Sequence, residues 1–300
     1  MRVIQVSIMP TTQKSRLESD LNAPLGIIAG SGMLPQALAR RCLDMGRPAV
    51  VVALDGFADL GDFEPHVRTS LRMGQGKKII SFFKKSGVRD LVFIGALRRP
   101  GIKELSPDLW TLWKLGPALI RGQLGDDGLL RVVRDLFEKE GFCIHGVQEF
   151  LPELLASSGP LGIYDADRSD EPDIDHAIRV VNALGSVDVG QAAVIQNGII
   201  LGVEGAEGTS ALITRCASLK RLGPGPILVK GAKPQQDHDL DLPTIGPNTV
   251  ELAIRAGFRG IVVEQGATLL ADPMRVIQMA NESKIFILGR AFSRASDQGR

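Results

Sequence analysis

The chain has few cysteines, and they form no recognisable pair or cluster. Cys42, Cys143 and Cys216 are the three in 300 residues, and they lie far apart without a CxxC pair. This spacing indicates neither a disulfide framework nor a zinc site built from cysteine ligands. We therefore expect three buried, reduced thiols in a cytosolic protein.

An excess of charge of one sign is also missing. Lysine and arginine total 35 residues against 34 of aspartate and glutamate, so the formal net charge is +1. Nucleic acid is not expected as a partner, because the chain as a whole offers no positive field to a polyanion. No apolar run approaches the roughly 18 residues needed to span a bilayer. The sequence therefore predicts a soluble protein that can still touch a membrane surface.

The familiar signatures of metallohydrolases and serine hydrolases are absent. His66, His145, His176 and His238 show neither metal-ligand spacing nor an HExxH motif. Neither a GxSxG elbow nor a Ser-His-Asp arrangement is evident, so covalent nucleophilic catalysis has no support in the sequence.

The apolar pattern indicates an α/β protein of two domains, as expected for this length. Residues 1–23 are expected to be a flexible leader, since they lack the apolar core of a signal peptide. In residues 24–155, apolar runs such as LGIIAG, PAVVVALD and DLVFIGAL alternate with amphipathic stretches. This alternation predicts an N-terminal Rossmann-like domain with a parallel sheet.

The second half reads differently from the first. Residues 156–172 are rich in Gly, Pro, Ser and Asp without periodicity, which favours an interdomain linker. Residues 173–300 predict a C-terminal catalytic α/β domain. Its sheet should be mixed, because Asn197-Gly198 suits a two-residue turn, and such a turn joins antiparallel strands.

Two glycine-rich loops in the first domain are candidate phosphate-binding sites. Gly30, Ser31 and Gly32 lie between a predicted strand and helix, where backbone amides can approach a pyrophosphate. Gln75 and Lys77 open the next helix, whose N-terminal lysines oppose the helix dipole unless an anion lies between them. A plain turn and solvated surface lysines are the alternatives for these loops.

An acidic pair, Asp126 and Asp127, opens a strongly amphipathic helix. One aspartate is expected to cap that helix. The second exceeds what a cap requires and could face a metal or a substrate hydroxyl.

Further carboxylates gather in the second domain. Gln191 precedes the predicted hairpin, and Glu204, Glu207 and Thr209 follow it; Glu207 could also be no more than a helix start. Downstream, a loop carries Lys233 and Gln236 and then carboxylates at 237, 239 and 241, which lie on one face if the chain is extended. A divalent ion with oxygen ligands would offset their repulsion, and a solvated acidic loop is the alternative.

Four segments together carry a resemblance to a known family. They are GIIAGSGMLP, GDDGLLR, DVGQAAVIQNGIILGVEGAEGT and the pair KPQQD and DLPTIGP, in this order along the chain. They resemble the signature segments of the LpxI type of UDP-2,3-diacylglucosamine pyrophosphatase, over about residues 25–288. The chain departs from the family pattern at Ser210, where EGTD is usual, and at His238 and Asp239, where many members carry an arginine.

The resemblance implies a hydrolase of lipid A biosynthesis with two domains closing around a chamber. It would cut the pyrophosphate of its lipid-linked sugar nucleotide to UMP and 2,3-diacylglucosamine 1-phosphate, using Mg²⁺, with Mn²⁺ as an alternative ion. The essential aspartate of the DLPxIG motif falls on Asp241. With that assignment, Asp241 and Glu207 are expected to hold the metal and Lys233 to meet the bridging phosphates. The substrate-binding candidates are Gly30, Ser31, Gly32, Gln75, Lys77, Asp126, Asp127, Gln191, Thr209 and Gln236.

The expected location is the cytoplasm, peripheral to the inner membrane and in transient contact with its surface, and a homodimer is left open. An alternative activity is a nucleotide-sugar or NAD(P)-dependent oxidoreductase, suggested by Gly30, Gly32 and Asp55, although a hydride-transfer site is not evident. A nucleotide-sensing or lipid-binding protein without turnover is a third interpretation.

Overall fold

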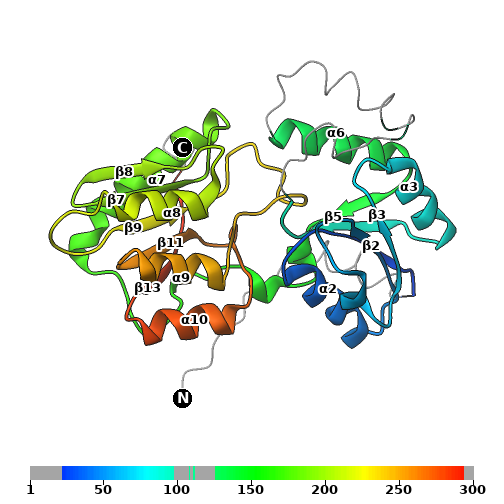
Figure 1. Cartoon of the computed structure of the whole chain (residues 1–300), viewed down its shortest axis with the longest axis horizontal. Coiled ribbons are helices and arrows are strands. Elements are labelled where there is room, and N and C mark those ends of the chain that lie inside the picture. The colour runs from blue at the N-terminus through cyan, green and yellow to red at the C-terminus, as the bar shows by residue number, and fades with distance from the viewer. Residues whose placement is uncertain (1–21, 98–107, 109–110, 112–125, 294–300) are drawn as a thin grey trace. The chain divides into compact units, whose positions relative to one another are not determined.

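The computed structural model describes residues 22–97, 108, 111 and 126–293, and these form two compact units (Figure 1). Unit 1 lies within residues 1–120 and 133–145, and unit 2 within residues 121–132 and 146–300. The expected leader, residues 1–23, lies outside the described residues except for Asn22 and Ala23.

Unit 1 is built on a five-stranded parallel sheet in the order β3-β2-β1-β4-β5. The strands are β1 (Leu25–Ala29), β2 (Ala49–Leu54), β3 (Val67–Leu71), β4 (Asp90–Ile94) and β5 (Cys143–His145). Every residue of β1 and β2 is buried, as their continuous apolar runs predict for strands covered on both faces. The predicted Rossmann-like parallel sheet is thus confirmed.

Helices connect these strands. They are α2 (Leu34–Asp44), α3 (Gly76–Lys85) and α6 (Asp126–Lys139), with a 3-10 turn η1 (Leu60–Phe63) before β3. Helix α3 buries Ile79, Ile80 and Phe83 and leaves its lysines exposed. The later part of α6 packs on β4 through Phe137, whose ring centroid lies 5.2 Å from that of Phe93.

A buried arginine connects the segment before β1 to the start of β4 in unit 1. Arg47 precedes β2, is 4% exposed, and donates to Asp90 Oδ2 at 2.6 Å and to the Ala23 carbonyl at 3.0 Å. On the other side of the same carboxylate, His145 Nε2 lies 3.1 Å from Asp90 Oδ1. The contact with His145, and after it that with Arg47, lowers the pKa of Asp90 against the effect of burial.

Arg47→Met is expected to lower the free energy of unfolding by about 2 kcal/mol at neutral pH. The methionine fills the buried volume, but Asp90 loses a charged partner in a mostly buried site. Because the pKa of Asp90 is lowered on folding, its contribution is present above the unfolded value of 3.8 and is lost as pH falls through the folded value. Urea denaturation should therefore show the two proteins converging below pH 3.8; an equal difference at all pH values would contradict this account.

Unit 2 contains a six-stranded mixed sheet in the order β6-β13-β11-β9-β7-β8. The strands are β6 (Gly159–Pro160), β7 (Ala192–Gln196), β8 (Ile199–Val203), β9 (Ile227–Lys230), β11 (Gly260–Glu264) and β13 (Phe286–Arg290). Strands β9, β11 and β13 are parallel, whereas β7 is antiparallel to both β8 and β9. The β7–β8 turn has positive φ at Asn197 and Gly198, so the predicted hairpin and mixed sheet are confirmed.

Four helices cover the two faces of this sheet: α7 (Glu171–Ser186), α8 (Gly208–Ala217), α9 (Pro247–Arg255) and α10 (Pro273–Glu282). One core contains Leu212 of α8, Val250 of α9 and Val276 of α10. The other contains Ile174 and Ile178 of α7. Alternate residues of β7 point to the two cores, which explains why the whole strand is buried. A separate two-stranded sheet pairs β10 (Thr244–Ile245) with β12 (Leu269–Leu270).

Residues 156–172, expected as a linker, belong to unit 2 in the structure. Ala156 lies in the core, and β6 pairs with β13. Short 3-10 turns, η2 (Val147–Glu149) and η3 (Pro152–Leu154), precede this segment, and η4 (Arg168–Asp170) ends it. Its glycines and prolines serve a short edge strand and tight turns, which give the same sequence pattern as a linker.

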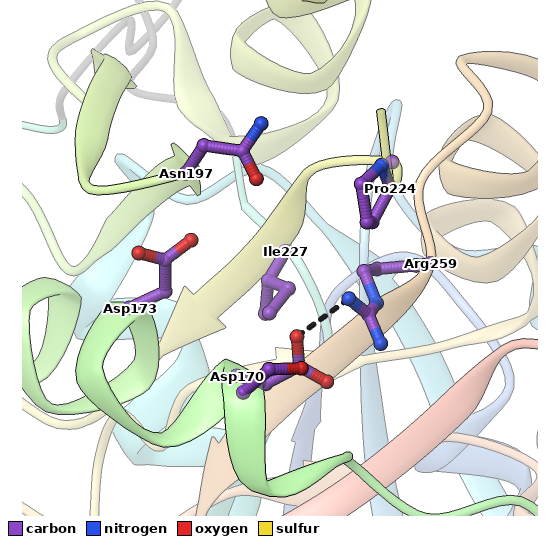
Figure 2. Close-up of a pocket in the computed structure, with 8 residues that line it drawn as sticks. Asp170, Asp173, Asn197, Pro224, Ile227 and Arg259 are labelled. Carbon is purple, nitrogen blue, oxygen red and sulfur yellow. Dashed lines mark ion pairs between the residues drawn. The ribbon is translucent and has the colours of Figure 1, made fainter. Parts of the chain in front are cut away.

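An ion pair fixes the end of this segment to the sheet (Figure 2). Asp170, before α7, is 4% exposed, and its Oδ1 lies 2.6 Å from Nη1 of Arg259, which precedes β11. Burial raises the pKa of Asp170 although the Arg259 charge opposes the shift. Both residues line a small pocket of about 120 Å³ with Asp173, Asn197 and Ile227. Ile227 begins β9, so this pocket lies at the edge of the sheet where β9 begins.

Candidate functional site

Polar residues of unit 2 gather at the opposite edge, where β8 and β9 end and β7 begins. Ala192 pairs with Lys230 and Ala193 with Val203, which brings these three strand ends together. Glu204 follows β8, Gln191 precedes β7, and Lys230 is the last residue of β9. Carboxyl ends of strands are where open α/β sheets place their ligands.

The centre of this cluster is a buried ion network. Lys230 Nζ donates to Thr209 Oγ1 at 2.9 Å and to the Thr244 carbonyl at 3.1 Å, and Thr209 Oγ1 donates to Glu204 Oε1 at 2.6 Å. Lys230 and Glu204 are 7% and 5% exposed. Burial lowers the pKa of Lys230, and the charges of Glu204 and Asp241 oppose that shift. The Lys230 ammonium thus lies in the field of two carboxylates and reaches Glu204 through Thr209.

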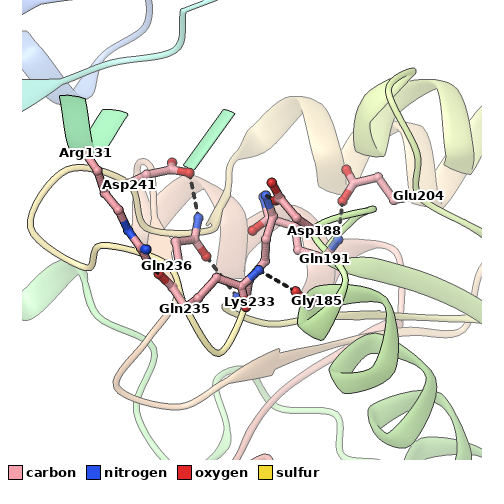
Figure 3. A network of polar contacts seen from close by, with 9 residues as sticks. All are labelled: Arg131, Gly185, Asp188, Gln191, Glu204, Lys233, Gln235, Gln236 and Asp241. Atoms are coloured by element: carbon pink, nitrogen blue, oxygen red, sulfur yellow. Dashed lines mark hydrogen bonds and ion pairs between the residues drawn. The ribbon is translucent and has the colours of Figure 1, made fainter. Parts of the chain in front are cut away.

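Beside Glu204, Gln191 presents a buried polar atom to the cluster (Figure 3). Its backbone N donates to Glu204 Oε2 at 3.0 Å. Its side-chain Oε1 is buried and has no hydrogen-bond partner within the part of the chain that the structure describes. A buried amide oxygen without a partner is costly, so a ligand or water is the natural complement. Gly190 lets the backbone before Gln191 lie this close to Glu204, since a Cβ at residue 190 would lie 2.2 Å from the Glu204 carbonyl oxygen.

The loop after β9 positions Asp241 through a glutamine. The side chain of Gln236, 6% exposed, accepts from the Lys233 backbone N at 3.0 Å and donates to Asp241 Oδ2 at 2.6 Å. The Asp241 backbone N donates to the Asp237 carbonyl at 2.9 Å. Figure 3 shows Gln236 between Lys233 and Asp241. The aspartate carboxylate is therefore held in one orientation near Lys230.

Lys233 is held by a carboxylate from the turn that follows α7. Its Nζ lies 2.6 Å from Asp188 Oδ1, and its side chain is 11% exposed. The turn that carries Asp188 has a positive φ of 56° and directly follows α7. The structure thus brings together five of the predicted site residues, namely Lys233, Gln236, Asp241, Gln191 and Thr209.

Glu207 lies in a different environment from the one expected. It precedes α8, its Oε1 accepts from Arg215 Nη2 at 2.8 Å, and its Oε2 accepts from the Gly205 backbone N at 3.2 Å. These contacts, with Arg215 first, lower the pKa of Glu207. The acid that the structure brings to Lys230 is Glu204, which follows β8 directly. In the sequence, Glu204 is distinguished only by its position at the end of a strand. Glu207 lies in the segment Glu207-Gly208-Thr209 and was therefore the stronger candidate.

In unit 1, the first glycine loop lies where the strand order reverses between β1 and β4. Ser31 and Ala96 exchange backbone hydrogen bonds of 2.9 and 3.0 Å, and Ser31 Oγ donates to the Ala96 carbonyl at 2.7 Å. A Cβ at Gly30 would lie 2.9 Å from that carbonyl oxygen, and Gly32 has a φ of +100°. Close packing and turn geometry therefore explain all three residues without a ligand.

The second loop of unit 1 has a similar structural explanation. Gln75 Oε1 accepts from the Arg72 backbone N at 3.1 Å, and the Lys77 backbone N donates to Asp108 Oδ2 at 3.3 Å. Asp108 thus lies at the helix N-terminus that was a candidate phosphate-binding site. Asp126 and Asp127 begin α6, and their side chains lie outside the part of the chain that the structure describes.

Carboxylates are the candidate metal ligands at this edge of the sheet. Within the described residues, three or more His, Cys, Asp or Glu side chains do not come together as a group that could hold a metal ion. Asp241 and Glu204 nevertheless supply hard oxygen donors, which suit Mg²⁺. Together with Lys230 they carry a net charge of −1 when all three are ionised. This donor set fits a hard ion such as Mg²⁺ or Mn²⁺, with further ligands from water or substrate, better than a zinc ion.

The fold and the site define an α/β protein with a buried carboxylate–ammonium cluster at the carboxyl edge of its second sheet. Residues 24–154 match the sequence model of the LpxI N-terminal domain, and residues 157–288 match that of the LpxI C-terminal domain. The chain belongs to the LpxI family. It is 39% identical over 274 residues to the UDP-2,3-diacylglucosamine pyrophosphatase LpxI of Caulobacter vibrioides. The aligned residues cover 88% of this chain and 96% of that protein.

Proposed function

We propose that this protein hydrolyses the pyrophosphate bond of UDP-2,3-diacylglucosamine, giving UMP and 2,3-diacylglucosamine 1-phosphate in lipid A synthesis. The single observation that carries the proposal is the 39% identity to the Caulobacter pyrophosphatase over nearly the whole of both chains. The buried cluster of Lys230 and Glu204 supports it, because oriented charged groups out of bulk water are what catalysis at phosphorus requires.

The residues around Asp241 have distinct roles in this proposal. Gln236 orients the Asp241 carboxylate, and Glu204 with Thr209 holds the Lys230 ammonium. Lys230 then offers positive charge to phosphate oxygens in a site from which water is largely excluded. Lys233 is a flexible second cation for the bridging phosphates, with Asp188 holding it when substrate is absent. The Gln191 side chain is positioned to bind a polar group of the substrate.

The proposed cofactor is Mg²⁺, with Mn²⁺ as an alternative, held by Asp241 and Glu204. When bound, the ion would neutralise charge on the pyrophosphate oxygens and make the attacking water more acidic. Glu204 replaces Glu207 in this proposal, because Glu207 already pairs with Arg215 while Glu204 lies in the Lys230 network.

Two matched substitutions distinguish these acids. Glu204→Gln should lower kcat about 10- to 100-fold, since the buried ammonium loses a charged partner in its network. Glu207→Gln should change kcat by less than about threefold, because its ion pair with Arg215 is exposed. Steady-state kinetics of both variants, with melting curves to confirm folding, make the comparison. If Glu207→Gln lowered kcat more than Glu204→Gln does, the proposed metal-binding role would belong to Glu207.

The function itself is tested by product analysis. The purified protein should release UMP from UDP-2,3-diacylglucosamine in the presence of Mg²⁺, with the lipid 1-phosphate as the second product. Incubation with NAD and NADP should leave cofactor fluorescence unchanged, which separates hydrolysis from the oxidoreductase alternative. Lipid binding without UMP release would favour a protein without turnover.

Within the described residues, none of the helices has both the length and the apolarity that crossing a bilayer requires. A lipid-linked substrate would nevertheless bring the protein to a membrane surface. We therefore propose a peripheral location at the cytoplasmic face of the inner membrane.

A further inference from the structure

The sequence around α3 carries a charge pattern unlike that of the whole chain. Between residues 72 and 89 there are six lysines or arginines and no aspartate or glutamate, although the chain overall has a net charge of only +1. The cations are Arg72, Lys77, Lys78, Lys84, Lys85 and Arg89. Such a local excess, within a nearly neutral protein, indicates a surface for an anionic partner.

The helix presents these lysines on the side away from its core contacts. Ile79, Ile80 and Phe83 are buried, whereas Lys77, Lys78 and Lys85 are exposed. Residues 77, 78, 81, 82 and 85 line one shallow groove. They follow the three- and four-residue spacing of a single helix face. We call residues 77, 78, 81, 82 and 85 the basic face.

An apolar side chain lies at the centre of the basic face. Phe82 is half-buried, its ring centroid lying 6.0 Å from that of Phe83, and it follows Lys78 by one helical turn and precedes Lys85 by another. A ring bordered by ammonium groups on long stems suits a surface that is negatively charged outside and apolar beneath. A soluble polyanion would use the lysines but give Phe82 no apolar environment.

Nearby acids do not cancel this charge. Glu140 pairs with Lys84, which lies outside the basic face, at 2.6 Å. Asp108 accepts from the Lys77 backbone N at the start of the helix. Among the described residues, the ion pairs of unit 1 leave Lys78 and Lys85 without a carboxylate partner.

We propose that the basic face of α3 is a docking surface for membranes that contain anionic phospholipids. The interaction is electrostatic, with Phe82 entering the interface between headgroups and acyl chains. Because an anionic surface attracts each nearby lysine, binding should weaken steeply with salt. This goes beyond the proposed hydrolysis, and vesicle binding can be measured without turnover, so either can fail while the other holds.

The test is co-sedimentation of the full chain with vesicles of phosphatidylcholine alone or mixed with phosphatidylglycerol. Binding is expected only to the mixed vesicles. The double variant Lys78→Gln/Lys85→Gln should bind about 30-fold more weakly, since each lysine contributes roughly a factor of five. Lys77 is left unchanged because it is also a substrate-binding candidate.

The matched control is Lys220→Gln/Lys284→Gln, which removes the same charge at two exposed positions of unit 2. It should bind the mixed vesicles as the unchanged protein does. If both double variants weakened vesicle binding equally, binding would depend on the net charge of the protein and not on the basic face, and the proposal would be overturned. The proposal would also be overturned if the α3 double variant, shown by its melting curve to be folded, bound the mixed vesicles as the unchanged protein does. Preferential binding of a DNA duplex over the vesicles would assign the basic face to nucleic acid instead.

Discussion

Asp241→Asn is expected to lower the turnover of UDP-2,3-diacylglucosamine by about 1000-fold or more. The substitution preserves shape and removes a negative charge that acts on Lys230. Loss of one oriented charged group from an active site costs about two to three orders of magnitude in rate, and the proposed metal ion would lose a ligand as well. UMP release under saturating substrate is the measurement.

The fold should survive this change. The introduced side-chain amide can turn so that its oxygen still accepts from Gln236, and the position is only partly buried. Asp239→Asn is the matched control, since it changes the same charge in the same loop, and it should retain activity within about tenfold. If the Asp241→Asn variant itself keeps activity within that range, Asp241 is not in the metal shell.

The second large effect is expected from removal of divalent ions. EDTA should eliminate UMP release, because Asp241 and Glu204 would then face the pyrophosphate charge with Lys230 and Lys233 alone. Added Mg²⁺ or Mn²⁺ should restore it, whereas zinc should not, since the donor set consists of carboxylates rather than cysteine or histidine.

A structural readout accompanies the chelator experiment. Mg²⁺ should raise the melting temperature of the unchanged protein more than that of the Asp241→Asn variant, because a ligand that binds the folded state stabilises it. Full activity in the presence of the chelator, after dialysis against it, would exclude a metal-dependent mechanism.

Local sequence patterns were sufficient where short-range chemistry decides the structure. The continuous apolar runs of β1 and β2 predicted strands buried on both faces, and Asn197-Gly198 predicted the antiparallel hairpin. Residues such as Asn and Gly encode a turn through their own backbone preferences, so no distant contact is needed to find it.

The segment 156–172 shows where composition alone is insufficient. Glycines, prolines and aspartates are typical of a linker, but they are equally typical of an edge strand and a helix start. Its place in unit 2 depends on pairing with β13 and on the Asp170–Arg259 ion pair, whose partners are 89 residues apart in the chain. A one-dimensional pattern carries no information about such a partner.

The candidate site could likewise be predicted only in part from the sequence. The sequence by itself determined the α/β class and the family, and it predicted Asp241 with Lys233 and Gln236 as site residues, because a contiguous motif places them in one loop. Only the tertiary structure distinguishes the surroundings of Glu204 from those of Glu207 and brings Lys230 to Thr209 beside Glu204. In the sequence Lys230 is the end of an apolar strand, whereas in the structure it is buried and the charges of Glu204 and Asp241 act on it. That burial exists only when β7, β8 and β9 pair and their ends meet, since desolvation is a property of the folded chain.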